Sequence, residues 1–222
     1  MTEYVSIAAS DYDKADRIRI TGASLAMNEF YNPDGTFVSY PQIKASFVNK
    51  IKKEDCKPEA TFNVVFVVGK AGYKTDAEGV EDTSVYEISG MIPQFGGKVD
   101  IVPFMAVNPG VIDAVSNYWS EGDTVRASGR LNFSSTVVET TVPVDFGEPI
   151  TQKKTINVSE LIVTGGSSTP LDGEYAINVE DIKAALVERK ERLAVAKQKA
   201  EEKGKSGKAP AAPKKQFADL GF

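Results

Sequence analysis

Two arginines four positions apart are the first candidates for binding chemistry in this chain of 222 residues. Arg126 and Arg130 lie in the segment TVRASGRLNF, in which apolar residues alternate with polar ones. This alternation predicts a β-strand with one buried face, and side chains four positions apart leave the same face. The apolar residues take the other face. The two guanidinium groups therefore point either to an anionic ligand or to solvent, and the sequence leaves both interpretations open.

A second kind of candidate combines an aromatic ring with lysine. Tyr73 follows Lys70 and precedes Lys74 in a glycine-containing segment, which we expect to be a loop between two strands. Phe95 and Lys98 bracket a Gly-Gly pair that predicts a hairpin turn. Exposed rings stack on nucleobases and cations attract phosphates. Both groups therefore have the chemistry to bind a single-stranded nucleic acid.

Five further residues are weaker candidates for the same surface. Tyr86 shares a predicted strand face with two isoleucines, so it belongs either to the core or to a ligand surface. Arg17 and Arg19 share one face of an N-terminal strand, and Lys153 and Lys154 precede the last predicted strand. We expect either basic pair to extend a groove that binds phosphates.

Composition argues against catalysis. The chain has no histidine, which is the commonest general base near neutral pH and the commonest ligand of transition metals. We therefore expect no enzyme, no cofactor and no metal site. The single cysteine, Cys56, fits a reducing cytoplasm. We expect neither a secretory signal nor a membrane span, because no apolar run approaches about 18 residues.

The net charge of −5 hides an asymmetry. From residue 183 onward there are eleven Lys/Arg and five Asp/Glu, whereas the rest of the chain is strongly acidic. An acidic body is not the usual footprint of a nucleic-acid-binding protein. Any contacts of the body with phosphates must therefore come from local clusters of basic residues.

The order of the predicted elements indicates a mainly β fold. Three strands precede a short helix, and two strands follow it, which is the order of the five-stranded OB barrel. We expect a β extension over residues 1–59 that packs on the barrel, and an OB core over 60–177. Trp119 on the helix is expected in the core, as are Phe62, Phe66 and Phe133 by alternation. The expected strands are 60–70, 82–95, 98–107, 121–133 and 154–166, and the expected inter-strand helix is 109–119.

A helix and a tail are expected to complete the chain. Asn178 is a suitable N-cap for a helix over 178–203, and the sequence becomes polar beyond Val195. We therefore expect the end of this helix to project into solvent. Residues 204–222 are rich in Lys, Ala, Gly and Pro and cannot bury enough apolar surface to offset their chain entropy. They are expected to form a disordered basic tail with an apolar tip.

The segment from YEISGM to GRLNF resembles the OB core of single-stranded-DNA-binding proteins from bacteriophages and prophages of Firmicutes. The run INVSELIVTGG is similar to the closing strand of the same proteins, and the resemblance covers residues 60–166. It implies binding of single-stranded DNA with little sequence preference during phage DNA replication or recombination, in the host cytoplasm. A homo-oligomer is compatible with this role.

The end of the chain carries a second resemblance. Bacterial single-strand binders close on a flexible linker and an acidic peptide ending in Pro-Phe, and this implies recruitment of replication or recombination proteins. Here only one residue of the tip is acidic, glycine stands in place of the proline, and the linker is basic. A tip without a function is the alternative. The expected partner-binding residues are Phe217, Asp219, Leu220 and Phe222.

Two other classes of function fit the sequence. A structural virion or scaffold-type protein also combines many strands, an acidic body and a flexible tail. An OB module also binds oligosaccharides or proteins in other contexts. Binding to DNA is distinguished from both by a steep loss of affinity with added salt.

Overall fold

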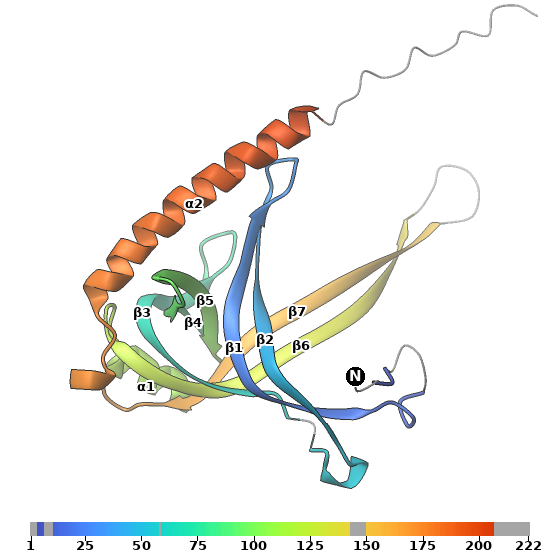
Figure 1. Cartoon of the computed structure of the whole chain (residues 1–222), viewed down its shortest axis with the longest axis horizontal. Helices are drawn as coiled ribbons and strands as arrows, with labels where there is room; N and C mark the ends of the chain where they lie inside the picture. The colour runs from blue at the N-terminus through green and yellow to red at the C-terminus, as the bar shows by residue number, and fades with distance from the viewer. Residues whose placement is uncertain (1–3, 7–10, 58, 143–149, 207–222) are drawn as a thin grey trace, which may run out of the picture.

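The computed structural model describes residues 4–6, 11–57, 59–142 and 150–206. A two-stranded hairpin comes first, a β-barrel follows, and a long helix ends the described part (Figure 1). The elements are β1 (Arg17–Tyr31), β2 (Phe37–Ile51), η2 (Lys53–Asp55), β3 (Thr61–Thr75), β4 (Glu81–Gln94), β5 (Lys98–Ala106), α1 (Pro109–Tyr118), β6 (Thr124–Val142), β7 (Ile150–Gly166), η3 (Gly173–Tyr175) and α2 (Val179–Ser206).

Strands β3 to β7 form a closed barrel in the order β3-β4-β5-β7-β6. All neighbours are antiparallel except β5 and β7, and β6 closes the barrel by pairing with β3. With α1 between the third and fourth strands, this is the topology of an OB fold. The predicted fold is therefore confirmed: a five-stranded barrel with an N-terminal strand extension, a short inter-strand helix and a C-terminal helix.

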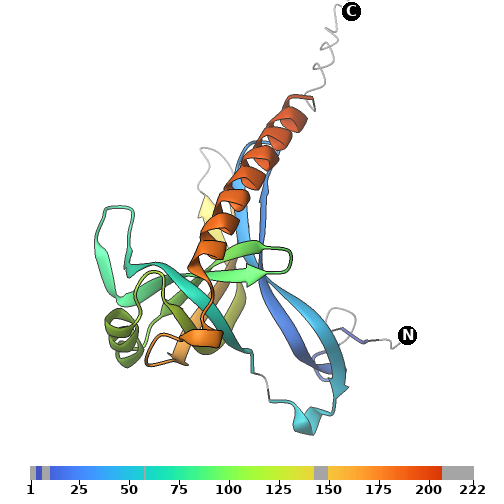
Figure 2. The same cartoon turned by 60° about the vertical axis from the view of Figure 1, so that its left-hand side comes forward.

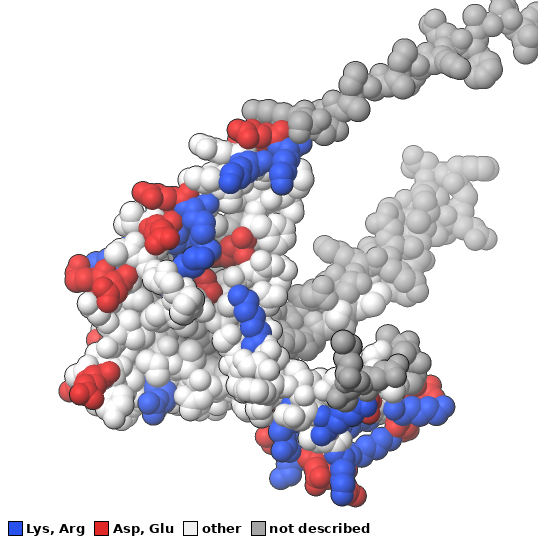
Figure 3. All heavy atoms as spheres, viewed as in Figure 1, with Lys and Arg blue, Asp and Glu red and all other residues white. Residues whose placement is uncertain are grey.

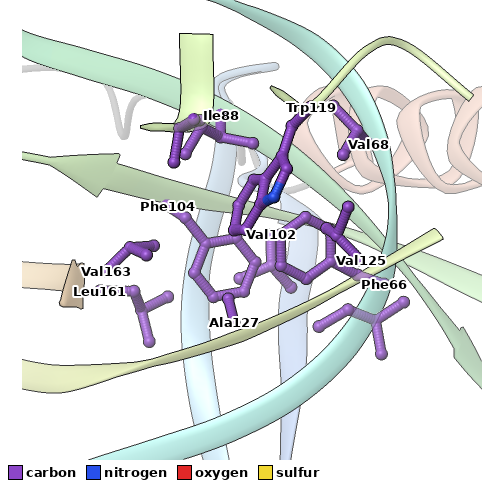
Figure 4. Packing of buried hydrophobic residues seen from close by; sticks show 12 residues of the cluster. Phe66, Val68, Ile88, Val102, Phe104, Trp119, Val125, Ala127, Leu161 and Val163 are labelled. Atoms are coloured by element: carbon purple, nitrogen blue, oxygen red, sulfur yellow. The ribbon is translucent and has the colours of Figure 1, made fainter. Parts of the chain in front are cut away.

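Aromatic side chains fill the centre of the barrel. The rings of Phe66 and Phe104 are stacked with centroids 4.8 Å apart, and Trp119 meets Phe66 edge to face at 6.0 Å (Figure 4). Trp119 is buried as expected, and its Nε1 donates to the carbonyl of Ser167 over 2.9 Å. Phe133 is 47% exposed, so its expected place in the core is wrong. It lies where β6 begins to leave the barrel as an arm paired with β7, and the core does not extend there.

The seam that closes the barrel depends on a glycine. Residues 127–130 of β6 pair with β3 on one edge and with β7 on the other. A Cβ atom at Gly129 would lie 2.1 Å from the carbonyl oxygen of Ile162 and 2.5 Å from Cζ of Phe62. Only a residue without a side chain therefore lets the strands approach this closely.

Helix α1 begins as the sequence predicts. The side chain of Asn108 accepts a hydrogen bond from the backbone N–H of Gly110, and proline occupies the start of the helix. Ile112 and Val115 are the buried residues of the helix, and Val115 belongs to the barrel core. The helix thereby covers one end of the barrel.

The hairpin of β1 and β2 forms a separate two-stranded sheet. It meets the barrel where β4 turns into β5: the N–H of Met27 donates to Oδ2 of Asp100 over 2.9 Å, and Gln94 donates to the carbonyl of Leu25. Leu25 and Met27 also pack against the barrel core. The middle of the hairpin is therefore fixed to the barrel.

Helix α2 packs on the barrel and then runs along the hairpin (Figure 2). Asn178 caps it as expected, since its side chain accepts from the N–H of Glu180. Ile182 and Ala185 are buried against Val67 and Val99 of the barrel.

The end of α2 does not project freely into solvent, and this expectation is wrong. Ala200 is buried, and Gly204 lies close to the carbonyl of Pro33 in the turn of the hairpin. The sequence pattern cannot show this contact, because the partner is a turn more than 160 residues earlier in the chain. The helix continues to Ser206, and residues 207–222 of the expected tail lie outside the described residues.

Replacing Gly129 with alanine is expected to lower the free energy of unfolding by about 1–3 kcal/mol or more, because the added methyl group overpacks the seam. Urea denaturation measures the change. Gly72→Ala is the matched control, since no atom lies within 4 Å of a Cβ at this strand position. Equal stability of the two variants would contradict the role of the seam.

Candidate nucleic-acid interface

The first candidate cluster lies at the end of β3 and the start of β4, and we call it the Tyr73 cluster: Lys70, Tyr73, Lys74 and Tyr86. The prediction that Lys70, Tyr73 and Lys74 lie in a loop is wrong, because β3 continues to Thr75. Tyr73 pairs directly with Tyr86 across the ladder, and the rings meet edge to face with centroids 5.2 Å apart. This aromatic pair extends the strand beyond the point where the glycine-containing sequence predicts its end.

A tight turn over residues 76–80 follows the cluster. Oδ1 of Asp76 accepts hydrogen bonds from the N–H groups of Glu78 and Val80 at 2.9 and 2.8 Å. Gly79 has a φ of +84°, a backbone angle that residues with a side chain rarely adopt. This turn connects the first two barrel strands, and OB folds use this loop to bind oligonucleotides.

The ring of Tyr73 is 37% exposed and borders a hollow of about 260 Å³. The other walls come from the start of β4 and from α1, including Ser84, Pro109 and Ser116. Burial and the nearby phenol of Tyr73 raise the pKa of Tyr86, so Tyr86 stays neutral under ordinary conditions. The hydrogen bonds from Ser84 lower the pKa of Asp82, which lies opposite Lys74 and offsets part of its charge.

The second candidate cluster is the turn between β4 and β5, with Phe95 and Lys98. The predicted Gly-Gly turn is present: Gly96 and Gly97 have φ values of +79° and +74°. Phe95 is fully exposed, at 102% of its reference area. A phenyl ring held entirely in water has no packing role in the described part of the chain, so its whole surface is available to a ligand.

A groove of about 560 Å³ lies between the hairpin and the outer face of β4 and β5. The strands supply Ser89, Ile101 and Pro103, and the hairpin supplies Phe37 and Tyr40, which are both 43% exposed. OB folds bind ligands on this face of their second and third strands.

The aromatic wall of this groove is not predicted from the sequence. The alternation in FVSYPQIK predicts a strand, but it gives no sign that the strand faces the barrel. Arg189 of α2 also borders the groove, and it is held by Glu29, whose side chain is only 5% exposed.

The Tyr73 cluster and the Phe95 turn are not one continuous surface. Tyr86 lies in the middle of β4, and the eight residues from it to Gln94 span about 26 Å at ~3.3 Å per residue. Between them α2 covers Met91 and Val99 on the outer face of the barrel. Of the expected DNA-contact residues, the structure thus brings together the Tyr73 cluster on one side and Phe95 with Lys98 on the other.

The remaining candidates lie elsewhere on the molecule. Arg126 and Arg130 are exposed on the outer side of β6, opposite Val65 and Thr61 of β3. The expected alternation of this strand is present, because Val125 and Ala127 are fully buried.

The two other basic pairs lie outside the barrel. Arg17 and Arg19 are on β1, in the two-stranded sheet of the hairpin, whereas both clusters are on barrel strands. Lys153 and Lys154 lie in the arm of β7, opposite residues 139 and 138 of β6, and their side chains are outside the described part. The tip residues Phe217, Asp219, Leu220 and Phe222 are outside it too.

The described residues contain no group of three or more His, Cys, Asp and Glu side chains that would hold a metal ion. Among the same residues, no helix has the length and apolarity needed to cross a membrane.

A family model named YorF matches residues 1–200 of the chain. No curated protein matches. The similar solved structures include a single-stranded DNA binding protein from Thermus aquaticus, with 12% identity, coverage of 75% of this chain and 65% of that one, and a TM-score of 0.44. A Plasmodium falciparum SSB complex with ssDNA has 19% identity, coverage of 53% and 99%, and a TM-score of 0.33. The mitochondrial protein Rim1 of S. cerevisiae has 12% identity, coverage of 50% and 94%, and a TM-score of 0.33.

Proposed function

The chain belongs to the YorF family, and we propose that it binds single-stranded DNA with little sequence preference. The observation that carries the proposal is the fully exposed ring of Phe95, held on a two-glycine turn of an OB barrel beside Lys98. A nucleobase is a suitable partner for such a ring, since stacking is worth about 1–3 kcal/mol per base. Every base has a flat face, so this contact tolerates all sequences.

The Tyr73 cluster supports the proposal farther along the β3–β4 pair. It combines a half-exposed ring with two lysines next to the loop that OB folds use for oligonucleotides. The groove beside Phe37 and Tyr40 offers further aromatic surface on the face of β4 and β5. Rings with neighbouring cations are the combination that single-strand binding without sequence readout requires.

The acidic body does not exclude this function, because phosphates respond to the local potential. Arg126 and Arg130 have no carboxylate partner among the described residues, so their charge is available to phosphates. In our proposal they contact the DNA backbone, and Arg17, Arg19, Lys153 and Lys154 extend the contact. The lysines beyond residue 196 add an attraction to phosphates that salt screens.

We further propose a biological setting for DNA binding and a second activity, the recruitment of a partner protein. The resemblance of residues 60–166 to phage proteins supports a role in phage DNA replication or recombination in the host cytoplasm, by binding rather than catalysis. The ring and apolar side chains of residues 217–222 support recruitment of a replication or recombination protein.

Phe95→Ala is expected to weaken binding of oligo-dT at low salt by about 1–3 kcal/mol, or roughly 5- to 150-fold, because one stacked base is lost. Fluorescence anisotropy of a labelled oligonucleotide measures the affinity. The unfolding curve should not change, since the ring has no protein contact to lose. Tyr175→Ala is the matched control: this tyrosine is 72% exposed but lies in η3, outside the turn that carries Phe95. Equal affinities of the two variants would argue against stacking on Phe95.

Replacing both Arg126 and Arg130 with alanine is expected to flatten the salt dependence. Each lost phosphate contact on a single strand removes about 0.7 from the slope of log K against log[salt], so the pair should remove about 1.4. Titrations at four or more salt concentrations give the slope. The double lysine variant keeps both charges and should keep the slope. A slope that is unchanged in the alanine variant would show that the pair faces only solvent.

Deleting residues 217–222 is expected to leave the affinity for oligo-dT within about twofold, because none of the proposed stacking residues lies in the tip. The same deletion should abolish capture of a replication or recombination protein from infected host cells. The full chain is the reference in both assays. A large change in DNA affinity would instead assign the tip to the DNA surface.

A further inference from the structure

One end of the β1–β2 hairpin is almost entirely exposed. From Arg17 to Ala23 and from Ala45 to Asn49, every residue except Arg17 is exposed. Such a sheet is at best marginally stable in water without a surface to pack on. We define the hairpin base as this end together with the segment that follows it to Lys57. Its apolar side chains need a partner that the described residues do not provide.

The largest exposed side chain of the hairpin base is Phe47, at 66% of its reference area. Its ring lies over Gly22, since a Cβ at that glycine would lie 3.2 Å from Cδ2 of Phe47. Gly22 has a φ of +62°, so a side chain is doubly disfavoured there. The Cδ2–Cε2 edge of the ring therefore lies against β1, and most of the side chain is open to solvent.

A cation lies next to this ring. The register pairs Thr21 with Phe47 and Arg19 with Asn49, so Arg19 and Phe47 share one face of the hairpin as diagonal neighbours. Arg19 also borders a hollow of about 540 Å³, lined by Lys50, Lys52 and Lys57 together with two carboxylates. Figure 3 shows Lys and Arg gathered at this end of the molecule, with acidic residues among them.

Two of the three lysines that line the hollow form ion pairs. Lys50 binds Asp16 at 2.7 Å, and Lys52 binds Glu54 at 3.5 Å. Arg19 and Lys57 have no ion-pair partner among the residues that the structure describes. Their cationic groups are therefore the ones available to an anionic ligand.

The two hairpin strands are themselves basic. They carry Arg17, Arg19, Lys44 and Lys50 but a single carboxylate, Glu29, which is engaged by Arg189 of α2. A second copy docked through the same base would place like charges against each other, at a cost in free energy. A polyanion with flat apolar rings matches both the charge and the open aromatic face.

We propose that the hairpin base is a second surface for single-stranded DNA, on which Phe47 stacks a base and Arg19 and Lys57 contact phosphates. This inference rests on the proposed function and extends it, because it assigns a site outside the barrel. A strand reaches the base only after it has left the barrel surface. The hairpin therefore adds affinity for long strands and none for short ones.

The experiment compares the wild-type chain with the double variant Phe47→Ala/Arg19→Gln, using oligo-dT of about 8 and about 30 nucleotides, which bracket the roughly 4–16 nucleotides that one OB fold covers. For the long strand the variant is expected to bind at least about tenfold more weakly and to occlude fewer nucleotides. For the short strand the two proteins bind equally. Phe47→Tyr keeps a stacking ring and keeps the affinity for the long strand, whereas Phe47→Leu keeps only apolarity and binds the long strand as weakly as the single variant Phe47→Ala.

Three results would overturn the inference. Equal affinity of the wild type and the double variant for the long strand would show that the hairpin base is not a second site. Equal losses for both lengths place the residues in the primary site. Recovery by Phe47→Leu, together with a concentration-dependent mass that the alanine variant loses, assigns the surface to a second copy of the chain. If the wild type binds neither strand, the proposed function itself fails, and this outcome is distinct from the three above.

Discussion

Strand β6 pairs on both edges at the same residues, and this double pairing closes the barrel. Around Gly129 the strand is held between β3 and the carbonyl of Ile162 on β7, at distances that leave no room for a side chain. Closure removes the exposed edges that an open sheet would present. The Tyr73 cluster and the Phe95 turn are both carried by strands of this closed barrel.

The barrel in turn fixes the parts outside it. Helix α2 packs on Val67 and Val99 and then binds Glu29 of the hairpin through Arg189, with Nε 3.1 Å from Oε2. The carboxylate is almost completely buried, so removing its partner would leave an uncompensated charge. One helix thus connects the barrel to the hairpin and forms part of the groove beside Phe37 and Tyr40. The charge of the body stays acidic overall, while cations next to rings remain at a few places.

The barrel itself could be predicted from the sequence, because alternation, a two-glycine turn and an Asn-Pro helix start are local signals. Tyr73 shows where local signals fail: glycines and charged residues around it predict a loop, but the ring of Tyr86 across the ladder extends the strand. The prediction for Phe133 fails for the opposite reason. The alternation continues along β6 into the arm that it forms with β7, where there is no core for the ring to fill. The aromatic wall of the groove depends on how a distant hairpin docks, and no local pattern carries that information.

The central claim is that single-stranded DNA lies on the exposed rings of the barrel, and photo-cross-linking tests it most directly. Oligo-dT carrying photoreactive thymine analogues is bound to the full chain at low salt, irradiated, and the cross-linked peptides are identified by mass spectrometry. The account predicts cross-links at Phe95 and at Tyr73, which excess unlabelled single strand abolishes and equal duplex does not. Cross-links confined to the outer face of α1, or no competition by single strands, would contradict it.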